Sequence, residues 1–348
     1  MDSSINFSEF DFTNKRRVKR VEKFLNTIGL DFPSSIEYFV VAKDGDELVA
    51  CGGLDGKVFK GIAVAPHRRG EGLILSVMTH LINIAYAKGI KDLFIFSTPN
   101  NIELFEGCGF KLIENCDNEI MLMENSDNLE KYKEKLALQR EDGNIIGTIV
   151  MNANPFTLGH QYLVEQAAKR SDWLHLFVVK EDLSKFKFKD RIRLITQGVS
   201  HIPNVTIHEG SDYIISNATF PTYFIKDKGK INELHAKLDL SIFRNHLAPA
   251  LGITHRFVGT EPYCVVTNNY NKNMKKILED PSGKSNPIEV VEIQRVEEGG
   301  KAISASRVRE LLKTKNFDEL KKIVPLSTLE FISDLTHYIA PIVKREQL

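Results

Sequence analysis

The stretch IIGTIVMNANPFTLGH, residues 145–160, says most about the architecture of this chain. Its near-continuous apolar run at 145–151 predicts a strand buried on both faces. A glycine-containing loop then leads into a helical pattern at 161–170. Similar elements follow, with strands expected at 173–179, 205–208, 254–258 and 288–293 and a helix at 191–199. This order predicts a Rossmann-like α/β fold, a parallel sheet with helices on both faces, and C-terminal helices from about Ser306.

The first 125 residues follow a different pattern, with short strands around one or two helices. Strands are expected at 37–42, 48–54, 58–64 and 93–96. A helical pattern runs from Gly72 to about Lys88 and ends at Gly89, which suits a C-cap. A small helix is expected at 101–106. We therefore expect an α+β domain over residues 1–125.

The segment 126–143 separates the two patterns. It is mostly charged, but Leu129, Tyr132 and Leu136 recur at helical spacing. We interpret it as a charged helical linker, which places a second domain at 144–348.

The overall composition is that of a packed globular protein without a net charge. Lys plus Arg and Asp plus Glu number 46 each, and 42% of the 348 residues are hydrophobic. Binding to nucleic acid is not indicated, because such proteins usually carry a basic excess. The basic run at 15–20 is read as the solvated face of an early helix. The chain has no apolar run of about 20 residues and no secretory signal, so we expect no membrane partner and a cytoplasmic location.

The loop at 154–160 is suited to phosphate. It lies between a strand and a helix, where exposed backbone N–H groups and the helix dipole attract anions. Gly159 allows close backbone approach, Thr157 offers a hydroxyl, and His160 offers an imidazole donor. The tetrapeptide TLGH, 157–160, resembles the T/H-x-G-H motif of the nucleotidylyltransferase superfamily. A plain helix N-cap with a histidine in its first turn is the alternative.

A second motif, ISASRVR at 303–309, resembles the I-S-x-S-x-x-R segment of the same superfamily. Ser304 or Ser306 can cap the helix that follows, and Arg309 can present a fork to phosphate oxygens. An ordinary capped helix with an exposed arginine is the alternative. The two motifs in this order predict nucleotide binding.

Longer strings make the resemblance more specific. The stretches VVKEDLSKF (178–186), GSDYIISNATFP (210–221) and VGTEP (258–262) are similar to the citrate lyase ligases, and the similarity extends over nearly the whole chain. It implies an ATP-dependent enzyme that adenylates acetate. The acetyl group then passes to the thiol of a dephospho-CoA-type group on the acyl carrier subunit of citrate lyase, with release of AMP and pyrophosphate. Mg²⁺ is expected as the counter-ion of ATP, without a dedicated metal site.

The motifs also imply roles for individual residues. Thr157 and His160 would hold the α-phosphate, with Asn154 and Gly159 in the same loop. Ser304, Ser306 and Arg309 would hold the distal phosphates, and we expect His160, Thr157 and Arg309 to be catalytic. Lys180 and Arg191 are weaker phosphate candidates. The acetate pocket is expected to be lined by 213–220, Thr260 and Glu261.

The first domain carries its own motif, APHRRGEGL at 65–73, which resembles the phosphate loop of the GNAT acetyltransferases. Arg69, Gly70 and Gly72 align with that loop, but Ile74 stands where the family has Gly or Ala. Phe105 stands where many members have a tyrosine acid. The domain therefore either holds a CoA-like group, such as the prosthetic arm of the carrier, or serves only to dock a partner or support the other domain.

Two other functions remain open from the sequence. One is an adenylyltransferase that acts on a phosphorylated small molecule and carries a fused GNAT acetyltransferase. The other is a scaffold that senses nucleotide and CoA without catalysis. The first would need no acetate, and the second would show no turnover.

Overall fold

The computed structural model describes residues 5–33, 35–116, 118–180, 185–216, 228–260 and 265–343. The chain divides into two compact units. Unit 1 comprises Met1–Lys133 and Asn217–Ile242, and unit 2 comprises Glu134–Ser216 and Phe243–Leu348. The boundary expected from the sequence assigns 217–242 to the second domain, whereas the described part of this segment, 228–242, belongs to unit 1.

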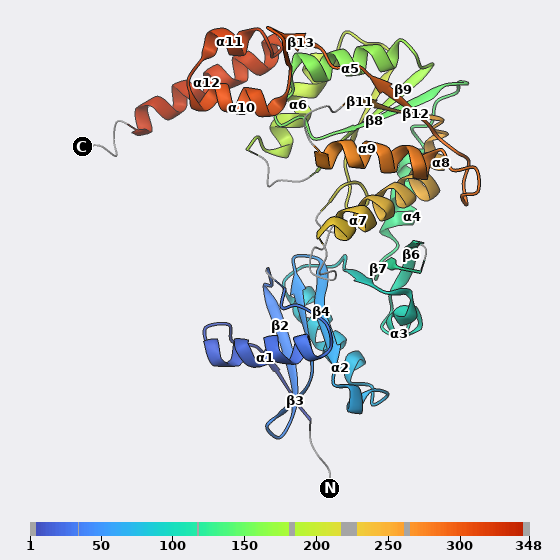
Figure 1. The fold of residues 1–348 in the computed structure, drawn as a ribbon, viewed down its shortest axis with the longest axis vertical. Coiled ribbons are helices and arrows are strands. Elements are labelled where there is room, and N and C mark those ends of the chain that lie inside the picture. Colours follow the sequence, from blue (N-terminus) through green and yellow to red (C-terminus); the bar gives the residue numbers. More distant parts are fainter. Residues whose placement is uncertain are drawn as a thin grey trace. The chain divides into compact units, whose positions relative to one another are not determined.

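Unit 1 is built on a seven-stranded sheet (Figure 1). The strand order is β1-β2-β3-β4-β5-β7-β6, and the only parallel pair among the described strands of this sheet is β4–β5. The strands are β1 (Asn6–Glu9), β2 (Tyr38–Asp44), β3 (Glu47–Asp55), β4 (Val58–Val64), β5 (Phe94–Ser97), β6 (Lys111–Cys116) and β7 (Ile120–Glu124).

The helices of unit 1 cover this sheet through apolar faces. The helix α2 (Leu73–Ala87) buries Val77, Leu81 and Ala85, which recur at helical spacing, against β2, β3 and β4. The helix α7 (Lys228–Ile242) packs on β6 and β7, which is why its segment belongs to this unit. The other helices are α1 (Lys15–Thr27), η1 (Pro66–Arg68), η2 (Pro99–Asn101) and α3 (Ile102–Glu106).

Unit 2 contains the parallel sheet that residues 145–160 predict. Its order is β10-β9-β8-β11-β12, and every pair is parallel. The strands are β8 (Ile146–Met151), β9 (Trp173–Val178), β10 (Val205–Glu209), β11 (His255–Gly259) and β12 (Glu289–Ile293). The chain therefore reverses its direction of strand addition between β8 and β11, and ligands of such sheets bind at the carboxyl ends of the strands at this point.

Helices lie on both sides of this sheet. Figure 1 shows α5 (Leu158–Ala168) and α6 (Phe188–Val199) on one side and α8 (Ala248–Leu251) and α9 (Val265–Leu278) on the other. The remaining elements are α4 (Asn128–Ala137), the π-helix η3 (Phe243–Leu247), the short strands β13 (Glu297–Glu298) and β14 (Lys301–Ala302), and the helices α10 (Ala305–Lys313), α11 (Phe317–Lys321) and α12 (Leu326–Val343). Within the described residues, no helix combines the length and apolarity that a membrane span requires.

Candidate active site

The loop after β8 closes onto the first turn of α5 through a reciprocal cap. The Thr157 hydroxyl accepts a hydrogen bond from the His160 backbone N–H at 3.3 Å. In return, the Thr157 backbone N–H donates to His160 Nδ1 at 3.1 Å. Two backbone donors that a helix start leaves unsatisfied are thereby paired. Thr157 is thus the N-cap that the sequence allowed as an alternative to a phosphate site. The same cap also fixes the orientation of the His160 imidazole, so the two interpretations are compatible.

This cap determines the tautomer of His160. Because a backbone N–H can only donate, Nδ1 must be an acceptor, and the ring proton of the neutral imidazole is assigned to Nε2. Burial, followed by the nearby Arg295 guanidinium, lowers the pKa of His160 to about 4. Phe156 stacks on the ring at a centroid distance of 5.8 Å. Near pH 7 the residue is therefore a neutral, oriented N–H donor.

The second motif meets the first directly. Ser304 caps α10 by accepting from the Arg307 N–H at 3.2 Å. A Cβ atom added at Gly159 would lie 3.0 Å from the carbonyl oxygen of Ile303, so only a glycine fits there without displacement. The starts of α5 and α10 therefore lie against each other, although the two motifs are more than a hundred residues apart in the sequence.

Arg309 joins the two loops. Its guanidinium donates to the Asn154 carbonyl oxygen through one nitrogen and to the Ser306 hydroxyl, at 2.9 Å, through another. Asn154 is itself fixed, because its side-chain oxygen accepts from the Phe186 N–H at 3.1 Å. The peptide bond between Asn154 and Pro155 is cis. A forked cation is thus held at the junction of two helix starts, an arrangement that suits an anionic ligand.

A cavity of about 270 Å³ lies between these loops. Five of the residues selected from the sequence line it: Thr157, Gly159, His160, Ser304 and Ser306. Arg309 and Asn154 do not line it but connect its walls. A neighbouring hollow of about 600 Å³, lined in part by Thr260 and Asn271, shares Gln294 and Arg295 with it.

Arg295 is the residue that sequence reasoning missed. It follows β12, at the carboxyl edge of the sheet, and lines both hollows. Its N–H donates to the Thr260 hydroxyl at 3.3 Å, which ties the ends of β11 and β12 together. The available signal was positional, because a polar residue just after a predicted parallel strand lies at the ligand edge of the sheet.

The structure places the two weaker candidates elsewhere. Arg191 is fully buried, and its guanidinium donates to the carbonyl oxygens of Phe186, Asn152 and Val179 at 2.8–3.1 Å. It therefore holds the ends of β8 and β9 together instead of facing a ligand. Lys180 is exposed and does not line the cavity.

Only some of the residues expected to line the acetate pocket belong to the described part of the chain. Tyr213 is buried, and Thr260 lines the larger hollow. Residues 217–220 and Glu261 lie outside the described residues. Among the described residues, no group of three or more His, Cys, Asp and Glu side chains is placed to hold a metal ion.

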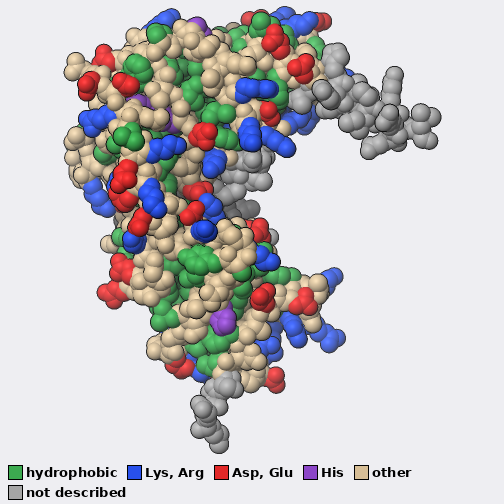
Figure 2. Space-filling view, turned by 180° about the vertical axis from the view of Figure 1, so that it is seen from behind, with side chains coloured by type: hydrophobic (Ala, Val, Ile, Leu, Met, Phe, Trp, Pro, Cys, Tyr) green, Lys and Arg blue, Asp and Glu red, His purple; other side chains and the backbone are tan. Residues whose placement is uncertain are grey.

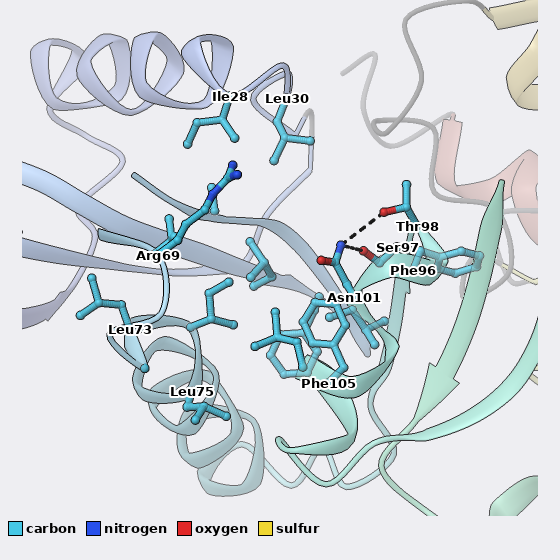
Figure 3. Close-up of a pocket in the computed structure, with 18 of the residues that line it drawn as sticks. Ile28, Leu30, Arg69, Leu73, Leu75, Phe96, Ser97, Thr98, Asn101 and Phe105 are labelled. Carbon is cyan, nitrogen blue, oxygen red and sulfur yellow. Dashed lines mark hydrogen bonds between the residues drawn. The ribbon is translucent and has the colours of Figure 1, made fainter. Parts of the chain in front are cut away.

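Unit 1 contains a separate cavity of about 710 Å³ (Figure 3). Arg69, Gly70 and Gly72 line it, as does Ile74. Gly70 and Gly72 have φ values of 86° and 74°, which L-residues rarely adopt, so both glycines are required by the backbone.

Ser97, Thr98 and Asn101 form one polar group in the lining of this cavity, and Arg69 lies apart from them on the other side (Figure 3). The Asn101 side-chain nitrogen donates to the Ser97 hydroxyl at 2.7 Å. Phe105 lies beside Asn101 (Figure 3), is buried, and offers no hydroxyl. The remaining lining is mostly aliphatic, which suits an uncharged chain.

Comparison with known families also separates the chain into two parts, but it keeps 217–242 with the second part. The model of the citrate lyase ligase C-terminal domain matches residues 146–332. The model of the acetyltransferase (GNAT) family matches residues 6–110. The predicted fold class, a GNAT-like α+β domain followed by a Rossmann-like domain, is confirmed.

Curated relatives resemble the chain over almost its full length. A [citrate [pro-3S]-lyase] ligase of Klebsiella pneumoniae is 50% identical over 92% of this chain and 94% of the relative. The protein of the same name from Escherichia coli is 45% identical, with 95% of each chain covered. That from Haemophilus influenzae is 45% identical over 92% of this chain and 96% of its own.

Proposed function

This chain belongs to the citrate lyase ligase family, and we propose from that premise that unit 2 adenylates acetate with ATP for transfer to a carrier thiol. The chain is thus a ligase that activates citrate lyase, as the resemblance in the sequence implied. Its protein substrate is the acyl carrier subunit of that lyase. The acetate specificity, the cofactors and the residue roles below are the parts that we propose.

One observation supports the nucleotide site above all others. Arg309 bridges the Asn154 carbonyl and the Ser306 hydroxyl, and so links two helix starts at the switch point of a parallel sheet. Two N-terminal dipoles and a guanidinium then attract negative charge from different directions. A triphosphate carries that charge in an extended form.

The first step is attack on the α-phosphorus of ATP. A carboxylate oxygen of acetate forms a bond to phosphorus, the bond to the bridging β-phosphate oxygen breaks, and pyrophosphate leaves with the electron pair. The product is acetyl adenylate. The carrier thiol loses its proton to solvent, and the resulting thiolate attacks the acetyl carbon. The bond between that carbon and the phosphate oxygen of AMP breaks, and AMP leaves with the electron pair.

Each residue of the site has a role in the first step. The Nε2–H group of His160 donates to an α-phosphate oxygen as charge develops there, and Thr157 fixes the ring that presents it. Gly159 keeps the backbone close to the phosphates. Ser304, Ser306 and Arg309 hold the distal phosphates, and Arg295, which lines the cavity, adds a second cation.

The described residues that line the phosphate cavity include no carboxylate. These residues therefore offer no carboxylate to Mg²⁺, which would enter on the phosphate oxygens of ATP with its waters. We further propose a CoA-like group in the unit 1 cavity and a cytoplasmic location, where ATP is available.

The decisive measurement is exchange of labelled pyrophosphate into ATP by the purified chain. Exchange that requires acetate supports the proposal, because only a reversible acetyl adenylate can return the label. Exchange that ignores acetate and requires a phosphorylated small molecule would favour the adenylyltransferase alternative. A chain that shows no exchange with acetate present would contradict the proposed chemistry.

A further inference from the structure

The helix α1 carries an unusual concentration of exposed cations. Its sequence is KRRVKRVEKFLNT, and Arg16, Lys19 and Lys23 lie on one exposed face at helical spacing. Among the described residues, none of these three forms an ion pair. Figure 2 shows Lys and Arg side chains gathered along the edge of unit 1 at which Figure 1 places α1.

The cations in the first turn of α1 destabilise the helix. The N-terminus of a helix bears partial positive charge, which favours acidic residues in the first turn. The first turn of α1 instead begins with Lys15, Arg16 and Arg17, and it contains no acidic residue. Asn14 caps the helix by accepting from Arg16 N–H and Arg17 N–H. Since the helix would form more readily with other residues, the cations point to an external anionic partner.

The basic helix leads directly to the unit 1 cavity. Ile28 caps its C-terminal end and lines the cavity, and Leu30 follows at the same rim. Arg69, an exposed residue of the glycine loop, points toward Ile28 across the mouth (Figure 3). Leu75, 41% exposed, adds an apolar contact to the lining. One continuous surface thus combines cations outside with an aliphatic interior.

We propose that this surface docks the carrier subunit, with an acidic face of the carrier on α1 and the CoA-type arm of the carrier inside the cavity. The identity of the carrier rests on the proposed function, but the charge and the cavity do not. A free small thiol would need the cavity alone. A cavity whose rim continues into a basic helix fits an arm that is attached to an acidic protein.

Phe105 explains why the cavity would hold the arm without acting on an amine. A GNAT enzyme of the common kind protonates its thiolate leaving group from a tyrosine at this place, according to the family pattern. Phe105 is 3% exposed and has no proton to give. The arm would therefore be bound here while its acetylation depends on the adenylate made by unit 2.

The charge can be tested with the triple variant Arg16→Glu, Lys19→Glu, Lys23→Glu. Steady-state acetylation of the purified, deacetylated carrier subunit should show a KM for the carrier that rises by at least about tenfold, because the field that attracts the partner is reversed. Raising the salt concentration should also raise the KM of the wild type for the carrier, because salt screens the attraction. A matched control, Lys91→Glu, Lys169→Glu, Arg170→Glu, changes the same charge at exposed positions elsewhere and should leave this KM unchanged.

The cavity can be tested with Thr98→Trp, which places a large ring at an exposed lining position. Thr79→Trp makes the same change on an exposed part of α2 that does not line the cavity. Dephospho-CoA should compete with the carrier in the wild type and in the α1 triple variant. Thr98→Trp should lose both that competition and most carrier acetylation, whereas Thr79→Trp should keep both.

The pyrophosphate exchange separates failure of this inference from failure of the proposed function. All unit 1 variants should retain acetate-dependent exchange at the wild-type rate, since the adenylate forms in unit 2. Intact exchange with an unchanged carrier KM in the α1 triple variant would overturn the docking surface. So would α1-dependent binding to vesicles of anionic phospholipid with carrier kinetics unaffected, and absence of competition by dephospho-CoA would remove the arm from the cavity.

Discussion

His160 has two ring nitrogens with separate duties, and these can be tested separately. Nδ1 completes the cap with the Thr157 N–H, and Nε2 is left to face the ligand. His160→Asn keeps an acceptor close to the Nδ1 position but removes the Nε2 donor. We expect acetate-dependent exchange to fall by about 10²–10³-fold in this variant, the typical effect of losing one transition-state donor.

His160→Ala should lose the same activity and also part of the cap, with a stability loss of about 1 kcal/mol. His160→Gln, whose amide nitrogen reaches the Nε2 position, should recover part of the exchange. Urea titrations and exchange rates on the three variants check this order. Equal activity of His160→Asn and the wild type would remove the proposed donor role.

Arg309 and Arg307 offer a matched pair on one helix. Arg309 spans the Asn154 carbonyl and Ser306, whereas Arg307 donates to the Glu298 carbonyl at 2.9 Å and pairs with Glu319. Replacing Arg309 by Lys removes the fork and leaves a single point charge. We expect Arg309→Lys to raise the KM for ATP and to slow exchange by about 10–100-fold, which is the loss of about 1–3 kcal/mol of a charged hydrogen bond.

Arg307→Lys should instead lower the unfolding midpoint slightly and leave exchange near the wild-type rate. Initial rates at varied ATP concentration distinguish the two variants. If both substitutions alter the KM for ATP equally, Arg309 has no special position at the phosphate.

Single residues also mark the limit of what the sequence could predict. Five residues of the site could be predicted because each lies in a recognisable motif at a helix start. The structure brings them together in one cavity: Thr157, Gly159, His160, Ser304 and Ser306. Arg191 could not be distinguished from a phosphate ligand in the sequence. Its three carbonyl partners come from the segments that follow β8 and β9, and only the fold brings them within reach. Arg295 was missed because it belongs to no motif.

The close approach between the starts of α5 and α10 requires a glycine at 159. Substitutions at this position therefore test whether activity depends on the distance between the two helix starts. An added methyl group would press on the Ile303 carbonyl, which lies 3.0 Å away on a segment pinned by the Ile303 N–H to the Val296 carbonyl. Gly159→Ala gains helix propensity of about 1 kcal/mol, so its global stability should change little. Exchange should nevertheless fall, because the two helix starts must separate.

The effect should grow with side-chain size. Gly159→Val should be less active than Gly159→Ala and also less stable. Thermal unfolding and pyrophosphate exchange, measured on both variants, check the two trends independently. Wild-type exchange in the valine variant would show that the close approach is not required.

A second contact between elements should make unit 2 sensitive to acid. His175 on β9 and His208 on β10 are both buried, with His175 Nδ1 and His208 Nε2 2.9 Å apart. One proton suffices for this hydrogen bond, and a second would place two N–H groups face to face. Burial lowers the pKa of His175 to about 4, and burial with the neighbouring His175 lowers that of His208 to about 3.

Both folded-state pKa values lie below the unfolded value of about 6.5, so the unfolded chain binds more protons in between. The stabilisation is complete above pH 6.5 and declines as the pH falls toward 4 and then 3. We expect the unfolding free energy to drop by roughly 1 kcal/mol per pH unit for each histidine. Trp173, the single tryptophan, bonds to Thr206 across the same strand pair and reports this unit by fluorescence.

The double variant His175→Asn, His208→Gln retains amide groups near the two bonded nitrogens but cannot titrate. Urea unfolding followed through Trp173 at pH 7.5, 6 and 5 should give a shallower loss of stability than in the wild type. His67→Gln, at an exposed position of unit 1, serves as the control. An equally steep decline in the double variant would assign the acid sensitivity to other groups.

The predictability of elements follows from their periodicity. The strand expected at 58–64 coincides with β4, and the helix expected at 72–88 differs from α2 by one residue at each end. The helix α7 was not predicted. From Leu234 to Leu240 nearly every residue is buried, including His235 and Asp239, so no amphipathic stripe exists to be read. Its packing on β6 and β7, from a distant part of the chain, is a property of tertiary structure alone.

At the scale of the whole molecule, two ligand sites in two units should respond independently. ATP with acetate should slow amide hydrogen exchange at the starts of α5 and α10 in unit 2, because bound phosphates would pair with those N–H groups. Dephospho-CoA should slow exchange at 70–73 in unit 1. At a ligand concentration of about 100 Kd, the free energy of the opening that permits amide exchange should rise by up to about 2.7 kcal/mol. This applies to amides whose exchange requires unfolding of the liganded unit.

Mass spectrometry of peptides from each unit measures both effects in one experiment on the full chain. The matched variant is Arg309→Ala, which should lose protection by ATP while protection by dephospho-CoA persists. Thr98→Trp should show the reverse. If ATP protected only 70–73, or if each variant abolished both responses, the assignment of adenylation to unit 2 and of the carrier arm to unit 1 would be wrong, since each assignment depends on a cavity lined by residues of one unit.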